Sequence, residues 1–235
     1  GGSSRAVDIP KHSFSLRLRE EYGLGALDYP LFTDQPSGEN ATESFDYLQL
    51  RSGFNFAWTH RHYYQSKHAQ YNRDQFVNDT YLAMGHPGIH GRWFHLYLNG
   101  LYWGVYHMHE RPDANFMASY FGGSKEDYDA VNSGEATDGN LNSWNAMWSL
   151  ARQASDPDAY AELQELLHVD ALIDYMILNF YVGNWDWDGH NWRAAGRSAD
   201  AEQGGGGWFF FPWDSEFAIS PNGAGAITNP EPIEN

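Results

Sequence analysis

Apolar and polar residues alternate along two neighbouring stretches in the middle of the chain. Residues 92–98 and 101–109 are rich in aromatic side chains, and Asn99 and Gly100 stand between them. Alternation is typical of half-buried strands, and Asn-Gly is the strongest short signal for a tight hairpin turn. The pattern therefore predicts an antiparallel β-hairpin.

Two further stretches carry weaker signals for strands. Phe14, Leu16 and Leu18 alternate with polar residues, so we expect residues 1–20 to form a small hairpin. A short strand is expected at 47–51, between segments that are rich in turn residues.

Apolar residues spaced by three or four predict helices elsewhere. This spacing occurs at 71–84, after Asp113, at 143–152, at 157–167 and after Asp170. Gly85 follows the first helix as a C-cap, and the two Asp residues are expected N-caps.

The last of these helices carries a wide apolar stripe and is therefore expected to be buried. The stripe consists of Leu172, Ile173, Met176, Ile177 and Phe180. Two short strands are expected after it, at 191–194 and 207–212, whereas 134–142 is predicted to be a loop because it is rich in Gly, Asn and Asp.

Length and composition narrow the possible classes of protein. The 235 residues are enough for one large domain or two closely packed lobes. A net charge of −17 argues against nucleic acid and anionic membrane surfaces as partners. The absence of Cys excludes disulfides and thiolate metal sites, and no apolar run is long enough to span a membrane. The abrupt beginning and loose end suggest a piece of a longer protein, so any export signal is expected outside it.

Candidate chemistry is concentrated in the loop after the last helix and behind the final strand. Asp186 and Asn191 are five positions apart, the spacing that protein kinases use for the residue that accepts the hydroxyl proton and for a magnesium ligand. Asp214 follows the apolar run WFFFPW, where a carboxylate needs a metal ion or a counter-charge. We therefore predict Asp186 as the catalytic acid-base residue, and Asn191 and Asp214 as metal ligands. Asp188 is the alternative to Asp186 in the same loop.

Candidate nucleotide-binding groups lie in the first half of the chain. Gly2, Ser3 and Ser4 offer backbone N–H groups and hydroxyls for phosphate. Lys11 either pairs with nucleotide phosphates or is a solvated lysine at a strand edge. Glu110 follows the predicted hairpin, where it either bonds the nucleotide or simply ends the strand.

Several motifs together resemble the spore coat protein H (CotH) family of atypical secreted protein kinases over almost the whole chain. They are GSSR with PKHSFSLRLREEYG, LDYPLF, YNRDQF with a following MG, YLNGLYWGVYHMHER, DGN with a following Trp, VDALIDYMILNFYVGNWDWDGHNW, and FPWDSEF. The chain departs from the family in having Glu216 where an Asp is frequent, and it stops short of the usual end of the domain.

The resemblance implies an α+β, two-lobed, kinase-like fold that is truncated at its C-terminus. Residues 1–110 would form an N-terminal lobe with an antiparallel sheet and one helix, and 111–235 a mainly helical C-terminal lobe. The implied activity is ATP-dependent phosphorylation of Ser or Thr hydroxyls in exported or coat proteins, with Mg²⁺ or Mn²⁺. By position, Lys11 would contact phosphate, and Asp186, Asn191 and Asp214 would keep the roles given above. The implied location is secreted or at the cell surface.

Other interpretations remain open. The histidine pairs His60 with His62 and His107 with His109 have the spacing of one strand face and could bind zinc, but the sequence places no third ligand. A catalytically silent kinase-like module for binding or coat assembly is a second possibility. A carbohydrate-binding or carbohydrate-hydrolysing domain that uses the many Trp and Tyr residues is a third.

Overall fold

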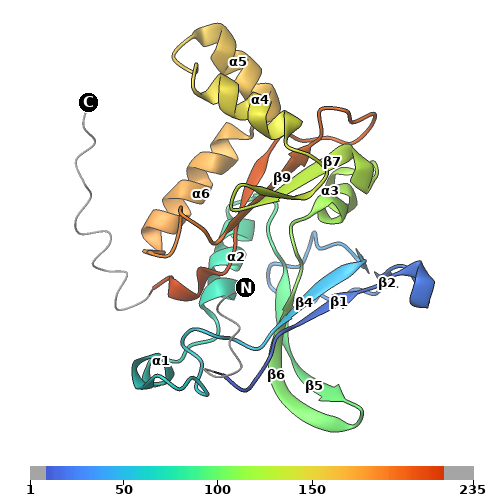
Figure 1. Ribbon diagram of the computed structural model, residues 1–235, viewed down its shortest axis with the longest axis vertical. Helices are drawn as coiled ribbons and strands as arrows, with labels where there is room; N and C mark the ends of the chain where they lie inside the picture. Colours follow the sequence, from blue (N-terminus) through green and yellow to red (C-terminus); the bar gives the residue numbers. More distant parts are fainter. Residues whose placement is uncertain (1–8, 220–235) are drawn as a thin grey trace. The chain divides into compact units, whose positions relative to one another are not determined.

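The computed structural model describes residues 9–219 and shows a mixed α+β protein with antiparallel sheets (Figure 1). The chain divides into two compact units. Unit 1 contains the described residues of Gly1–Asp79 together with Ile89–Arg111, and unit 2 contains Thr80–Gly88 together with the described residues of Pro112–Asn235. Within the described part, no helix is both long and apolar enough to cross a membrane.

Unit 1 is built on a four-stranded antiparallel sheet with the strand order β1-β4-β6-β5. Its strands are β1 (Phe14–Arg17), β4 (Tyr47–Arg51), β5 (Gly91–Leu98) and β6 (Leu101–His109). A second, small ladder joins β2 (Leu27–Asp28) to β3 (Ser44–Phe45). The helices are η1 (Glu20–Tyr22), α1 (Tyr63–Lys67) and α2 (Arg73–Ala83), of which α2 ends in unit 2.

The hairpin predicted around Asn99 and Gly100 is confirmed. Both residues have positive φ, of 51° and 80°, which matches the tight turns whose twist fits a two-stranded ribbon. The strands on either side, β5 and β6, form the long curved hairpin of Figure 1. The predicted strand at 47–51 and the predicted helix at 71–84 are confirmed as β4 and α2.

The small hairpin expected within residues 1–20 is wrong for the part that the structure describes. Strand β1 pairs with β4, from Phe14 opposite Leu50 to Arg17 opposite Tyr47. Alternation marks a strand but does not identify its partner, and β4 offers two fully buried leucines on its inner face. Residues 1–8 lie outside the described part of the chain.

Unit 2 contains its own four-stranded antiparallel sheet, with the order β10-β9-β7-β8. Its strands are β7 (Tyr128–Asn132), β8 (Glu135–Asp138), β9 (Trp192–Arg197) and β10 (Phe209–Pro212). Its helices are α3 (Ala114–Phe121), η2 (Lys125–Asp127), α4 (Asn142–Ala151), α5 (Pro157–Leu166), α6 (Val169–Tyr181) and η3 (Ser215–Phe217). The strands predicted at 191–194 and 207–212 are confirmed as β9 and β10. Strands β7 and β8 were not predicted, because 111–235 was expected to be mainly helical.

Two local predictions in unit 2 need correction, and one is confirmed. The segment 134–142 is not all loop, because it contains β8, a polar edge strand that lacks the apolar alternation by which strands are recognised. Asp170 is not the N-cap of α6, since His168 holds that position and Asp170 lies in the first turn. Asp113 does cap α3, and its carboxylate accepts a hydrogen bond from the backbone N–H of Phe116.

Helix α6 buries a different face from the predicted one. The side chains of Ile173, Ile177 and Phe180 are 48–56% exposed, so the expectation that this stripe is buried is wrong. The buried face carries Tyr175 and Leu178, and the ring of Tyr175 packs against Phe210 of β10 at 5.9 Å. Because α6 is apolar around most of its circumference, its pattern could not reveal which face meets the sheet.

Candidate functional site

The candidate residues of unit 2 meet at one end of the β9–β10 ladder. The last pair in that ladder joins Pro212 to Trp192. Asn191 comes directly before β9, and Asp214 follows β10 by two residues. Antiparallel pairing therefore brings these two residues to the same end of the sheet.

The loop that carries Asp186 is tied to the C-terminal end of α6. Asn184 is buried, and its side-chain amide donates to Oδ1 of Asn179 at 3.0 Å. The indole N–H of Trp187 donates to the hydroxyl of the buried Tyr175 at 2.6 Å. These contacts lie on both sides of Asp186, so the loop that carries it is supported on the helix core.

Both carboxylate oxygens of Asp186 have partners. Oδ2 accepts a hydrogen bond of 2.7 Å from Nδ2 of Asn191, and Oδ1 lies 2.9 Å from Nε2 of His190. An ionised carboxylate can only accept, so the NH₂ group of Asn191 faces Asp186 and the amide oxygen is not used in this bond. The Asn191 oxygen is therefore suited to bind a cation.

Electrostatics links Asp186 to Asp214. Burial raises the pKa of Asp186 above its ordinary value, and the negative charge of Asp214 raises this pKa further. His190 and the hydrogen bond from Asn191 act in the opposite direction. The two carboxylates thus share one electrostatic environment, in which a divalent cation would be favoured.

The backbone at the site adopts conformations that are uncommon for residues other than glycine. Asp188, Asn191 and Asp214 have φ values of 79°, 62° and 55°, in the left-handed region. Asp and Asn tolerate this region better than other side chains, and such outliers concentrate at functional sites. The surrounding structure must hold these three residues in place.

Asp188 differs from Asp186 in its surroundings. Its side chain is exposed, whereas its backbone carbonyl accepts a hydrogen bond of 3.0 Å from the indole of Trp192. The geometry therefore favours Asp186 over Asp188 as the functional acid of the loop.

The remaining predicted residues lie in unit 1 or outside the described part of the chain. The ammonium group of Lys11 donates to the carbonyl of Val105 and lies 4.3 Å from the ring centre of Tyr106, and burial lowers its pKa. Glu110 is buried, and its Oε2 accepts hydrogen bonds from the backbone N–H and from Nδ1 of His90, at 2.9 and 2.8 Å. The predicted phosphate contacts Gly2, Ser3 and Ser4 lie among residues 1–8, outside the described part.

His190 is a site residue that the sequence interpretation missed. It sits four positions after Asp186, and its side chain is 61% exposed. Only the tight loop brings its ring to the carboxylate. The one feature of the sequence that could have indicated a role for His190 is its position between Asp186 and Asn191.

A cavity of about 420 Å³ lies at the other end of α6. Its lining includes His86, His168 and Phe209, and it opens beside the first turn of the helix. Asp186 follows the last turn, so this cavity is separate from the candidate site.

Comparison with protein-family models gives a match to CotH, described as CotH kinase protein, over residues 1–228. A search among curated proteins gave no match.

Proposed function

The chain belongs to the CotH kinase family, and from this premise we propose that it transfers the γ-phosphoryl group of ATP to Ser or Thr hydroxyls of exported or coat proteins. One observation in unit 2 carries the proposal beyond family membership. Asp186 accepts a hydrogen bond from Asn191, and the negative charge of Asp214, at the same end of the β9–β10 ladder, raises the pKa of Asp186. Phosphoryl transfer to a hydroxyl needs a base for the hydroxyl proton and, close to it, two ligands for the metal ion.

Asp186 is the proposed base. Its carboxylate would accept the proton of the incoming hydroxyl and orient the oxygen toward the phosphorus atom. Burial and the charge of Asp214 raise its pKa, which makes it a better proton acceptor than an ordinary Asp. The contacts with Asn191 and His190 fix the orientation of the carboxylate.

The donor set at the site fits Mg²⁺, or Mn²⁺ in its place. The carboxylate of Asp214 and the amide oxygen of Asn191 are hard oxygen ligands, which these ions prefer. When bound, the ion would neutralise charge on the phosphate oxygens of ATP. The hydrogen bond from Asn191 to Asp186 positions the side-chain amide.

We extend the proposal to unit 1 and to the location of the protein. Lys11 would contact phosphate, since its ammonium group has three N–H donors and uses one of them on the carbonyl of Val105. The backbone of Gly2, Ser3 and Ser4 would assist. The hydrogen bonds of Glu110 to His90 support a structural role for this acid at the end of β6 rather than a nucleotide contact. The parts 1–110 and 111–235 would act as two lobes of an extracytoplasmic kinase.

The direct test is incubation of the purified chain with γ-labelled ATP, Mg²⁺ or Mn²⁺ and a Ser-rich acceptor protein. We expect label to enter Ser or Thr, and chelation of the metal to abolish the incorporation. Thermal unfolding with and without ATP and metal is measured in parallel, because a ligand of the folded state raises Tm. Absence of both label and thermal shift would contradict the kinase proposal. A thermal shift without transfer would instead favour the silent binding module.

His190→Ala is expected to shift the acidic limb of the pH–activity profile to higher pH. His190 lowers the pKa of Asp186, so His190→Ala should raise that pKa. Asp186 serves as a base only when ionised, and activity therefore falls as pH falls through its pKa. The acidic limb of kcat/KM against pH should move to higher pH, while the rate on the plateau changes little. A bound cation would lower the pKa of Asp186 in the variant and in the unsubstituted protein alike. The acidic limb of the variant should therefore still lie at the higher pH.

The matched control is His95→Ala on the exposed side of β5, which should leave the pH profile in place. An unchanged acidic limb in His190→Ala would show that the histidine does not act on the base.

A further inference from the structure

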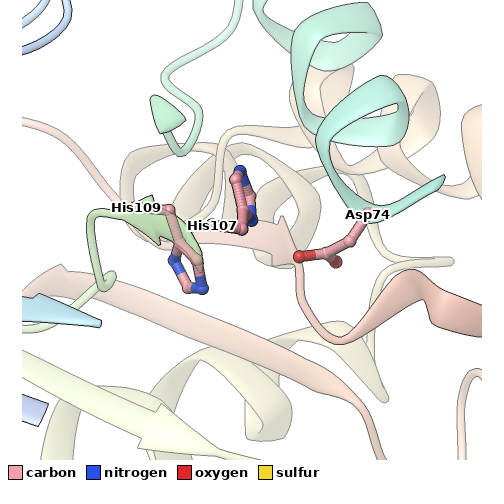
Figure 2. Close-up of side chains that lie close together, drawn as sticks. All are labelled: Asp74, His107 and His109. Atoms are coloured by element: carbon pink, nitrogen blue, oxygen red, sulfur yellow. The ribbon is translucent and has the colours of Figure 1, made fainter. Parts of the chain in front are cut away.

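Unit 1 brings together three metal-ligating side chains that the proposed kinase chemistry does not use. Asp74 comes from the first turn of α2, and His107 and His109 come from the end of β6 (Figure 2). Each offers one ligand atom, and these atoms all lie within 4.8 Å of one another. The three residues are 2–7% exposed. Imidazole and carboxylate groups are seldom buried together unless they are paired or bind an ion.

The fold explains why the histidine pair alone could not show this site. Residues two apart on a strand point to the same face, so His107 and His109 are neighbours by sequence. Asp74 is more than thirty positions away, and the fold brings it to the histidines at the start of α2, where Gln75 is hydrogen-bonded to His107. Within the described residues, His60 and His62 acquire no such third ligand.

Both imidazoles are oriented by an outer hydrogen bond. Nδ1 of His109 bonds the backbone carbonyl of Glu110, and Nε2 of His107 bonds the side-chain carbonyl of Gln75. A carbonyl can only accept, so the bonded ring nitrogens carry the protons and the opposite nitrogens carry the lone pairs. Metal-ligating histidines almost always donate their second N–H to a carbonyl or carboxylate in this way.

The outer shell is itself held in place. Nε2 of Gln75 donates to Oδ1 of Asp79 at 2.7 Å, and the hydroxyl of Ser37 donates to the same oxygen at 2.7 Å. This chain of bonds fixes the Gln75 carbonyl and, through it, the ring of His107. Such support is what keeps ligands in the geometry that an ion requires.

Gly91 makes room for the cluster. It lies opposite His109 in the β5–β6 ladder. A Cβ atom at this position would be 2.2 Å from Oε1 of Gln75 and 2.6 Å from Nε2 of His107. The absence of a side chain at Gly91 therefore allows the imidazole and its amide partner to occupy this space.

Arg51 forms an ion pair with Asp74, one of the three proposed ligands. Its guanidinium lies 3.2 Å from Oδ2 of Asp74, in an ion pair that is largely shielded from solvent. A carboxylate has two oxygens, so an ion can share Asp74 with the arginine. The cation of Arg51 nevertheless competes with a metal ion for the negative charge.

We propose that Asp74, His107 and His109 form a binding site for a divalent transition metal ion, with Zn²⁺ as the expected occupant. Two imidazoles and one carboxylate suit zinc and its neighbours, whereas Mg²⁺ and Ca²⁺ prefer oxygen ligands alone. A fourth position remains for water. The ligands are buried, so the ion ties α2 to β6 rather than acting on a substrate. The site shares no residue with Asp186, Asn191 or Asp214.

Metal content tests the proposal directly. The purified, tag-free chain is stripped with chelator, incubated with ZnCl₂ in the presence of excess Mg²⁺ and passed through a desalting column. Mass spectrometry of the metal content should give about one zinc per chain. Zinc at about 100 times its Kd should raise Tm by on the order of 5–10 °C. Co²⁺ in place of zinc should give visible absorption bands of a low-coordinate nitrogen and oxygen site.

Variants of the ligands separate this site from other zinc binding. His107→Ala and Asp74→Asn should each lose the bound zinc and the rise in Tm. Gln75→Ala, which removes only the outer partner, should weaken zinc binding by about 10- to 100-fold. The matched control is the double variant His60→Ala, His62→Ala, which removes the other histidine pair and should retain one zinc. Asp214→Asn should also retain it.

Two results would overturn the proposal. One is a chain that holds no zinc after this treatment. The other is stoichiometric zinc in Asp74→Asn or His107→Ala. Asp74→Asn keeps the size of the side chain, so it decides the matter if His107→Ala does not fold.

Discussion

Asp186→Asn is expected to lower kcat for phosphoryl transfer by about a thousandfold, with little change in KM for ATP. The Asn side chain has the same size, and its oxygen can still accept a hydrogen bond, but it cannot take the proton of the hydroxyl. The measurement is steady-state kinetics with a Ser-rich acceptor. A general base contributes mainly to the transition state, so the loss should fall on kcat.

The fold should survive this substitution. Burial and the charge of Asp214 disfavour the ionised carboxylate of Asp186, so a neutral amide relieves both effects. We therefore expect an unchanged or slightly higher Tm, which distinguishes lost chemistry from lost structure.

Asp188→Asn is the matched control, because it makes the same change two residues away on an exposed side chain. Its kcat should stay within a few-fold of the unsubstituted chain. If Asp188→Asn were the more damaging change, Asp188 rather than Asp186 would be the base.

Local signals in the sequence were sufficient where one short segment determines its own conformation. The Asn99-Gly100 turn has positive φ at both residues and joins two strands of the predicted bounds, apart from one residue at the start of β5. The Asp113 cap is equally local, since its carboxylate bonds a backbone N–H three residues later. In both cases the residue type itself favours the observed geometry.

Predictions from local sequence were wrong where the structure of a segment depends on a partner that is distant in the sequence. The polar strand β8 exists because the backbone of β7 pairs with it, and its own side chains carry no apolar pattern. Helix α6 has apolar residues on several faces, and its packing on Phe210 of β10 selects the face with Tyr175. The sequence of the helix alone therefore does not determine which of its faces is buried.

The same distinction applies to the two clusters of polar residues. Asp186 and Asn191 were predicted together from their five-position spacing, and the structure adds a hydrogen bond between their side chains. The antiparallel pairing of β9 and β10 brings Asp214 to the same end of the sheet as Asn191. The apolar run before Asp214 indicated a buried strand but not its pairing partner. Asp74 could not be linked to the β6 histidines at all, since a helix acid of this kind is usually only solvated.

Asp214→Asn is expected to reduce phosphoryl transfer by at least about a thousandfold and to remove the ATP- and metal-dependent rise in Tm. The substitution takes away the charged ligand that Mg²⁺ requires, and an amide oxygen is a poor replacement. Asn is the appropriate variant because position 214 has a left-handed backbone, with φ of 55° and ψ of 41°, which Asn tolerates better than Ala.

Comparison of this variant with Asp186→Asn separates binding from chemistry. If Asp214 holds the ion and Asp186 only takes the proton, Asp186→Asn should keep the thermal shift with ATP and Mg²⁺, whereas Asp214→Asn should lose it. Glu165→Gln, on the exposed side of α5, is the control for a general change of charge and should keep most of the activity. Full thermal shift and full transfer in Asp214→Asn would exclude this carboxylate as the metal ligand, and the site would then have to be sought around other acids.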